Sequence, residues 1–94
     1  MIHPWNITVN DNAQLGKNVT LFKGSTIGVI EHGKKRGYPI IGNNVTVCAN
    51  ATICGNVKIG DNVLICAGAF VNFDVPDNST VIGNPGTIHT FRGF

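Results

Sequence analysis

The sequence predicts an all-β fold, a three-sided parallel β-helix, because branched apolar residues recur at every sixth position over residues 41–76. The recurring positions are Ile41, Val47, Ile53, Ile59, Ile65 and Val71. Four positions after each of them comes a second small or branched apolar residue: Val45, Ala51, Val57, Val63, Ala69 and Val75. No helix has a period of six, whereas a six-residue self-similarity is typical of parallel β-helix repeats. Three repeats form a coil of eighteen residues, so Ile41 should stack on Ile59, roughly 4.8 Å away. The other expected pairs are Val47 with Ile65 and Ile53 with Val71.

The same period is present in residues 9–27. Val9, Leu15, Leu21 and Ile27 are each six positions apart. Val9 and Ile27 therefore differ by eighteen, which closes one coil. About five coils are expected, in a single domain that covers residues 1–94.

The register breaks after Ile27, and the next regular position is Ile41, fourteen residues later. The segment 28–40 contains three glycines, one proline and four charged residues. We expect it to protrude from the coil as a loop, and long loops on rigid scaffolds often carry function. A solvated excursion without a function is the alternative interpretation.

Asparagines should occupy the bends between the strands, because asparagine tolerates a positive φ better than most residues. The candidates are Asn43, Asn44, Asn50, Asn56 and Asn62.

The regular pattern is expected to stop at Pro76, since proline lacks the N–H that a stacked strand donates. It restarts briefly at Val81 and Ile82. Residues 77–94 should then form an irregular C-terminal cap with a turn at residues 83–86, because a solenoid must cover its open edge.

Composition and charge argue against several classes of partner. A net charge of +2 and a pI near 8.6 are too mild to indicate nucleic-acid binding. No apolar stretch approaches the roughly 18 residues of a membrane span, and no signal peptide follows Met1. We therefore expect no membrane partner and a cytoplasmic location.

The chain has three cysteines, an odd number that fits this location better than a disulfide framework. Cys48 and Cys66 are eighteen apart and should lie one coil above the other. A disulfide between them is one interpretation. The favoured interpretation is that each fills a small-residue position as a compact buried apolar side chain.

A single prism of this size has a thin core, because each coil contacts only its neighbours. Its flat faces expose apolar residues that would gain from being covered. We therefore expect a homo-oligomer, most naturally a homotrimer.

Three segments carry a resemblance to a known family. They are the H-x-x-[NG]-[IV]-x-[IV]-[NG] start at residues 3–10, the spacing from Thr26-Ile27-Gly28 to Pro39, and the V-P-(x)5-I-G-N-P ending at residues 75–85. With the hexads, the chain resembles the hexapeptide-repeat acyltransferases, and most closely the C-terminal β-helix of serine O-acetyltransferase. The resemblance implies a trimer of left-handed β-helices that binds acetyl-CoA in the groove between subunits. It also implies acetyl transfer to a small hydroxyl acceptor, such as serine or a sugar, with no metal.

The resemblance implies that His3 is the general base that takes the proton of the acceptor hydroxyl. An imidazole, with a pKa of about 6.5, suits that task at neutral pH. The positions carried over for the cofactor are Ala49, Ala67, Gly68, Thr80, Gly83 and Pro85. In addition, Lys34 and Lys35 of the loop are expected to attract the cofactor phosphates by charge.

A second hypothesis is a non-catalytic trimeric β-helix, a remnant or binding module without a complete active site. Two positions favour it: Tyr38 stands where the family has a histidine before the loop proline, and Ile2 replaces the acidic residue before the catalytic histidine.

Two further classes are disfavoured. A β-helical metalloenzyme needs three converging histidines, but the hexad phases of His3, His32 and His89 differ. An ice-binding helix needs a continued threonine file, and Thr8 and Thr26 are the only members expected.

Overall fold

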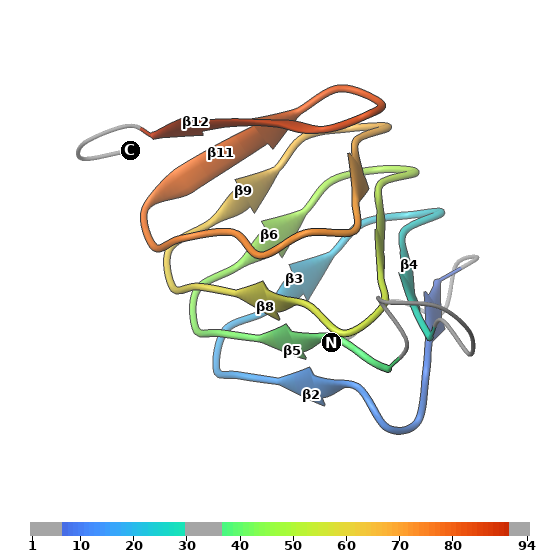
Figure 1. The fold of residues 1–94 in the computed structure, drawn as a ribbon. Helices are drawn as coiled ribbons and strands as arrows, with labels where there is room; N and C mark the ends of the chain where they lie inside the picture. Colours follow the sequence, from blue (N-terminus) through green and yellow to red (C-terminus); the bar gives the residue numbers. More distant parts are fainter. Residues whose placement is uncertain (1–6, 30–36, 91–94) are drawn as a thin grey trace.

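Short strands stacked in parallel make up the fold of the chain (Figure 1), for which the computed structural model describes residues 7–29 and 37–90. The strands are β1 (Thr8–Val9), β2 (Gln14–Leu15), β3 (Thr20–Leu21), β4 (Thr26–Gly28), β5 (Ile40–Ile41), β6 (Thr46–Val47), β7 (Thr52–Cys54), β8 (Lys58–Ile59), β9 (Leu64–Ile65), β10 (Phe70–Val71), β11 (Ser79–Ile82) and β12 (Thr87–Thr90). In the part of the chain that is described, no helix is long and apolar enough to cross a membrane.

The strands form three sheets, one for each side of a prism. Their orders are β1-β4-β7-β10, β2-β5-β8 and β12-β11-β9-β6-β3. All pairings are parallel except that of β11 with β12. The predicted left-handed parallel β-helix is confirmed. The first sheet marks four levels among the described residues, so the expected count of about five coils is not confirmed.

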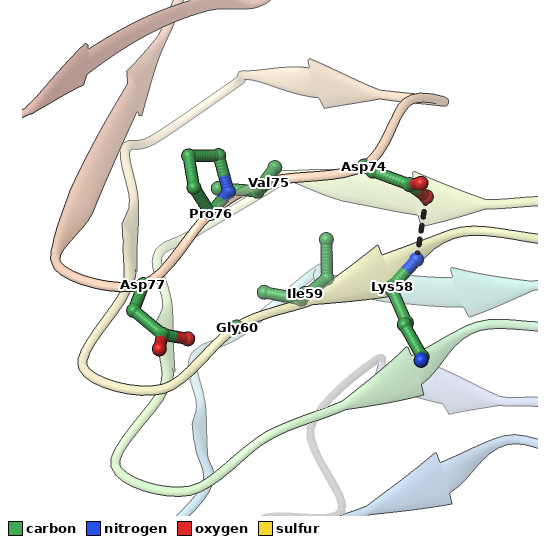
Figure 2. Close-up of a pocket in the computed structure, with 7 residues that line it drawn as sticks. All are labelled: Lys58, Ile59, Gly60, Asp74, Val75, Pro76 and Asp77. Atoms are coloured by element: carbon green, nitrogen blue, oxygen red, sulfur yellow. Dashed lines mark hydrogen bonds between the residues drawn. The ribbon is translucent and has the colours of Figure 1, made fainter.

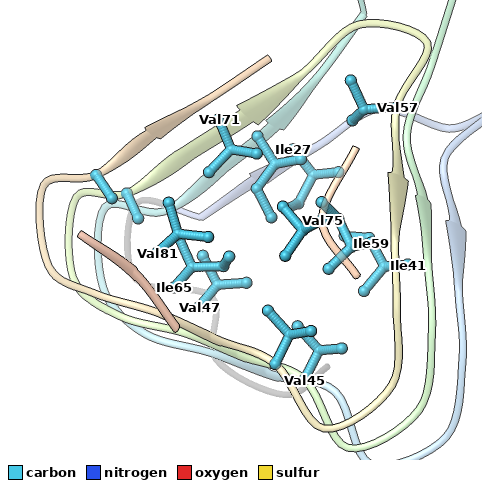
Figure 3. Packing of buried hydrophobic residues seen from close by; sticks show 14 of the residues in the cluster. Ile27, Ile41, Val45, Val47, Val57, Ile59, Ile65, Val71, Val75 and Val81 are labelled. Carbon is cyan, nitrogen blue, oxygen red and sulfur yellow. The ribbon is translucent and has the colours of Figure 1, made fainter. Parts of the chain in front are cut away.

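Inward-pointing files of Val, Ile, Leu and Ala fill the prism (Figure 3). The predicted stacking is confirmed, because Ile41 pairs with Ile59, Val47 with Ile65 and Ile53 with Val71. These six side chains are at most 3% exposed. The core is thus made by the hexad positions that the sequence repeats.

The break after Ile27 inserts eight residues. Leu15 pairs with Ile41, twenty-six positions later, whereas Val9 pairs with Ile27 at eighteen. The excess lies between Gly28 and Ile40, where the loop was predicted, and residues 30–36 of it lie outside the described residues. The same offset corrects the threonine file, because Thr26 pairs with Thr52 and so continues the file from Thr8.

The prediction that Pro76 stops the pattern was wrong. Ile59 bridges to Val75 and Ile65 pairs with Val81, both sixteen positions later, so the last coil is two residues shorter but continues. On the lower levels of this corner, Gly16, Gly42 and Gly60 each donate their N–H to the coil above. In the described residues no coil lies above Pro76 on this face, so no N–H is needed there.

The end of the described chain is regular rather than irregular. β11 continues the sheet of β9, and β12 returns antiparallel beside it, with Thr80 opposite His89. Between them, Phe70 N–H donates to Gly83 O and Gly86 N–H to Phe70 O, both at 3.0 Å. The connection is thereby tied to the top of β10.

One corner is held by a ladder of asparagine side chains. The bonds run from Asn18 Nδ2 to Asn44 Oδ1 (3.0 Å), Asn44 Nδ2 to Asn62 Oδ1 (3.3 Å) and Asn62 Nδ2 to Asn78 Oδ1 (3.2 Å). All four residues, like Asn50, have φ between 58° and 60°. The expected positive φ is thus confirmed at Asn44, Asn50 and Asn62, but not at Asn43 or Asn56.

Candidate functional site

A file of small residues runs along the corner between the β6-β9-β11 sheet and the β7-β10 sheet. Val47 pairs with Ile65, so the residues two positions further on, Ala49 and Ala67, lie one above the other. Gly83 does not continue this file, because Gly83 O accepts from Phe70 N–H as Ala69 O accepts from Thr52 N–H one coil below. The structure therefore brings together two of the residues predicted for the cofactor, Ala49 and Ala67.

Tight turns create this file. Ala51 N–H donates to Cys48 O (3.2 Å) and Ala69 N–H to Cys66 O (3.1 Å), which closes one turn on each level. The turns need a positive φ, which is 60° at Asn50 and 72° at Gly68. Because the side chains of Ala49 and Ala67 are single methyl groups, the corner presents a low ridge of backbone.

The other predicted positions differ in accessibility. Gly68 and Pro85 are exposed, Gly68 N–H donates to Ala49 O of the file, and a Cβ added at Gly68 would meet no atom within 4 Å. Thr80 is only 5% exposed, because it lies in β11 between Leu64 and His89. A ligand on the ridge would therefore reach Gly68 and Pro85 more readily than the Thr80 side chain.

Three predicted residues, His3, Lys34 and Lys35, lie outside the described residues. Their placement relative to the file is therefore a prediction from the sequence.

A hollow of about 390 Å³ lies elsewhere, on the side of the prism formed by β8 (Figure 2). It is lined by Lys58, Ile59, Gly60, Asp74, Val75, Pro76 and Asp77. Two of its carboxylates hold neighbouring coils: Asp74 Oδ1 accepts from Lys58 N–H (2.9 Å) and Asp77 Oδ1 from Asp61 N–H (2.7 Å). The sequence analysis missed this hollow, because it depends on the shortened last coil.

A second hollow, of about 180 Å³, is lined by Asn44, Thr46, Asn62, Val63 and Leu64. Of the predicted cofactor residues that the structure describes, none lines either hollow. The candidate site is therefore an open ridge in the single chain and not a closed pocket.

Comparison with known proteins supplies the family. Residues 38–72 match the model of the bacterial transferase hexapeptide (six repeats). A serine acetyltransferase from Staphylococcus aureus is 42% identical over 88 residues, which are 92% of this chain and 40% of that protein. The chain is a hexapeptide-repeat protein related to the serine acetyltransferases.

Solved structures agree with this. The serine acetyltransferase of Neisseria gonorrhoeae in complex with serine has a TM-score of 0.80 and 39% identity, over 90% of this chain and 34% of that one. The enzyme from Brucella abortus in complex with coenzyme A has a TM-score of 0.82 and 34% identity, over 90% and 34%. The hexapeptide-repeat chain thus spans about two fifths of the curated relative and about a third of the solved chains.

The three thiols of the hexapeptide-repeat chain are free and partly exposed. The expectation that Cys48 and Cys66 are buried apolar side chains was therefore wrong. Both follow an inward-pointing residue, so the alternation of the strand turns them outward. Burial, and secondarily the charge of Cys66, raises the pKa of the Cys48 thiol, and burial raises the pKa of Cys54.

Proposed function

We propose that the chain is an acetyl-CoA-dependent O-acetyltransferase of the serine acetyltransferase type, acting in the cytoplasm on a small hydroxyl acceptor, serine or a sugar. The observation that supports it most directly is the file of Ala49 and Ala67. Relatives with the same fold have been solved with serine and with coenzyme A. The chain spans only part of the length of these relatives, and we propose that it has their acetyltransferase activity.

In this proposal the pantetheine arm lies extended along the file, because side chains longer than a methyl group would lift it off the backbone. Gly68 and Pro85 flank it. A homotrimer supplies the opposite wall of the groove from the neighbouring subunit. Lys34 and Lys35 attract the phosphates at the nucleotide end.

The proposed chemistry is a direct transfer. His3 takes the proton of the acceptor hydroxyl as its oxygen attacks the thioester carbonyl, the carbon–sulfur bond breaks, and coenzyme A leaves with its thiol restored. A neutral imidazole is needed, because a protonated ring has no lone pair to accept the proton of the hydroxyl. The scheme includes no metal ion.

A non-catalytic trimeric binding module is the second candidate function. Tyr38 favours it, because a phenol does not replace an imidazole as a general base. Ile2 favours it too, since no carboxylate at that position orients His3. Such a module would keep the cofactor ridge and lack turnover.

The test combines binding and turnover. Calorimetric titration with acetyl-CoA and with coenzyme A measures the affinity of the ridge for each. Release of the coenzyme A thiol, followed with a panel of hydroxyl acceptors, measures the rate of acetyl transfer. We expect His3→Ala to lower turnover by roughly 100-fold or more while leaving acetyl-CoA binding unchanged. His89→Ala, at an exposed histidine of β12, is the matched control.

The ridge is tested separately. Ala67→Leu should weaken acetyl-CoA binding by roughly tenfold or more, because the larger side chain lies on the path of the cofactor. Gln14→Leu introduces the same side chain at an exposed position of β2 and should change nothing. Binding without turnover on any acceptor would favour the binding module, and equal binding by both variants would contradict the ridge.

A further inference from the structure

Two cysteines lie one above the other on the outside of the β6-β9 pair. Val47 and Ile65 are in register and fully buried, so Cys48 and Cys66, the next residues, point outward. The backbone ladder continues through them, because Cys48 N–H donates to Ile65 O and Cys66 N–H to Val81 O, both at 2.9 Å. The two residues are thus held one coil apart on the outer face of a hydrogen-bonded parallel sheet.

Both thiols are accessible and close to each other. Each is partly exposed, and neither is part of a disulfide. The charge of Cys66 contributes to the raised pKa of Cys48, which requires the two sulfur atoms to be within electrostatic reach. Cys54 differs, because it pairs with Gly28 in another sheet and its pKa is raised by burial alone.

The spacing of the coils suits a bridging ion better than a direct bond. Neighbouring strands place stacked Cβ atoms roughly 4.8 Å apart, whereas a disulfide prefers about 3.8 Å. Two metal–sulfur bonds of about 2.3 Å in a nearly linear arrangement span about 4.6 Å. A disulfide would pull the coils together, but an ion between the sulfurs would not.

The number of ligands selects the ion. Zinc takes four ligands, and in the ranges that the structure describes no group of three or more His, Cys, Asp or Glu side chains converges. Soft thiolates favour Cu(I), which two sulfurs satisfy in a linear complex. We propose that Cys48 and Cys66 form a two-thiolate binding site for a soft monovalent ion of the Cu(I) class.

Binding changes no oxidation state. One Cu(I) ion replaces the protons of the two thiols, and two protons are released to the solvent. Affinity therefore rises with pH, because the two cysteines bind the ion as thiolates. The site does not depend on acetyl transfer, so its test stands apart from that of the proposed function.

The experiment is an anaerobic competition titration of the full chain with Cu(I) against bicinchoninate, whose Cu(I) complex is coloured. We expect one ion per chain, with an affinity that increases between roughly pH 6 and pH 8. Cys48→Ser and Cys66→Ser should each weaken binding by roughly 100-fold or more, because one of the two metal–sulfur bonds is lost. Cys54→Ser is the matched control and should bind as the wild type does.

Thermal unfolding is a second measurement, which compares each variant with and without Cu(I) and so does not depend on how stable the variant is. Cu(I) should raise the Tm of the wild type and of Cys54→Ser, but not of Cys48→Ser or Cys66→Ser. Wild-type affinity in either of those two variants, or loss of binding in Cys54→Ser alone, would overturn the proposal. So would a Cys48–Cys66 disulfide that persists in the protein after treatment with a thiol reductant, seen by mass spectrometry as a mass two hydrogens below that of the free thiols.

Discussion

Thr26 lies in register with Thr52, twenty-six residues further along the chain, although Thr8 and Thr26 are only eighteen apart. The surplus of eight residues lies between Gly28 and Ile40, and the pairings on either side of it are undisturbed. The loop is therefore an insertion into one coil, because the strand pairings before and after it, β1 with β4 and β2 with β5, are parallel like those of the other coils.

We predict that deleting residues 30–37 leaves the β-helix folded. The deletion restores a six-residue interval between Ile27 and Ile41, so the free energy of unfolding should change by about 1 kcal/mol or less. Deleting residues 30–39 shortens the interval to four and removes the buried Pro39, which should cost several kcal/mol, roughly 3 or more. Urea unfolding followed by circular dichroism measures the free energy of unfolding of both variants. An equal decrease in the two would contradict the interpretation of the loop as an eight-residue insertion.

The asparagine ladder should contribute measurably to stability. Asn62 bonds to the coils on both sides, at 3.3 Å to Asn44 and 3.2 Å to Asn78, and its φ is 58°. We expect Asn62→Ala to cost about 2 kcal/mol, because it removes both bonds and places an alanine in the left-handed region. Asn62→Gly loses the same bonds without the backbone strain, so it should cost about 1 kcal/mol less. Identical losses in chemical denaturation would show that φ is unimportant there.

A second row of contacts at the same corner requires glycine. Asn43 N–H donates to Asp61 Oδ1 at 2.8 Å, and a Cβ added at Gly42 would collide with that oxygen and with Gly60 O. Gly42→Ala should therefore cost roughly 1–3 kcal/mol. Gly28→Ala is the control, since its Cβ would meet only Cys54 and Thr26 at 3.8 Å. A stable Gly42→Ala chain in thermal unfolding would contradict this packing.

The regular coils could be predicted because one rule acts at every level. An inward position must be apolar and a corner must turn, so apolar residues repeat in the sequence and stack one coil apart in the structure, as Ile41 does with Ile59 and Val47 with Ile65. The file of Ala49 and Ala67 follows from the same period. These features depend only on the residues within each hexad, and they recur because the hexad recurs.

The departures come from contacts between segments that no period connects. Proline was expected to end the pattern, but the need for an N–H at Pro76 depends on whether another coil lies above it. The low exposure of Thr80 depends on the return of β12 beside β11, which a turn signal alone does not specify. The outward direction of Cys48 could have been read from alternation, since it follows the inward Val47.

The thiols should make stability decrease at alkaline pH. Burial raises the pKa values of Cys48 and Cys54 above their ordinary value of 9.0, so above that pH the folded chain holds protons that the unfolded chain has released. Because the folded state then binds more protons, the free energy of unfolding falls as the pH rises through the raised values. Urea unfolding from about pH 8 to pH 11 should give a flatter profile for the double variant Cys48→Ser, Cys54→Ser than for the wild type. Thr46→Ser is the control, and an unchanged slope in the double variant would assign the pH dependence to other groups.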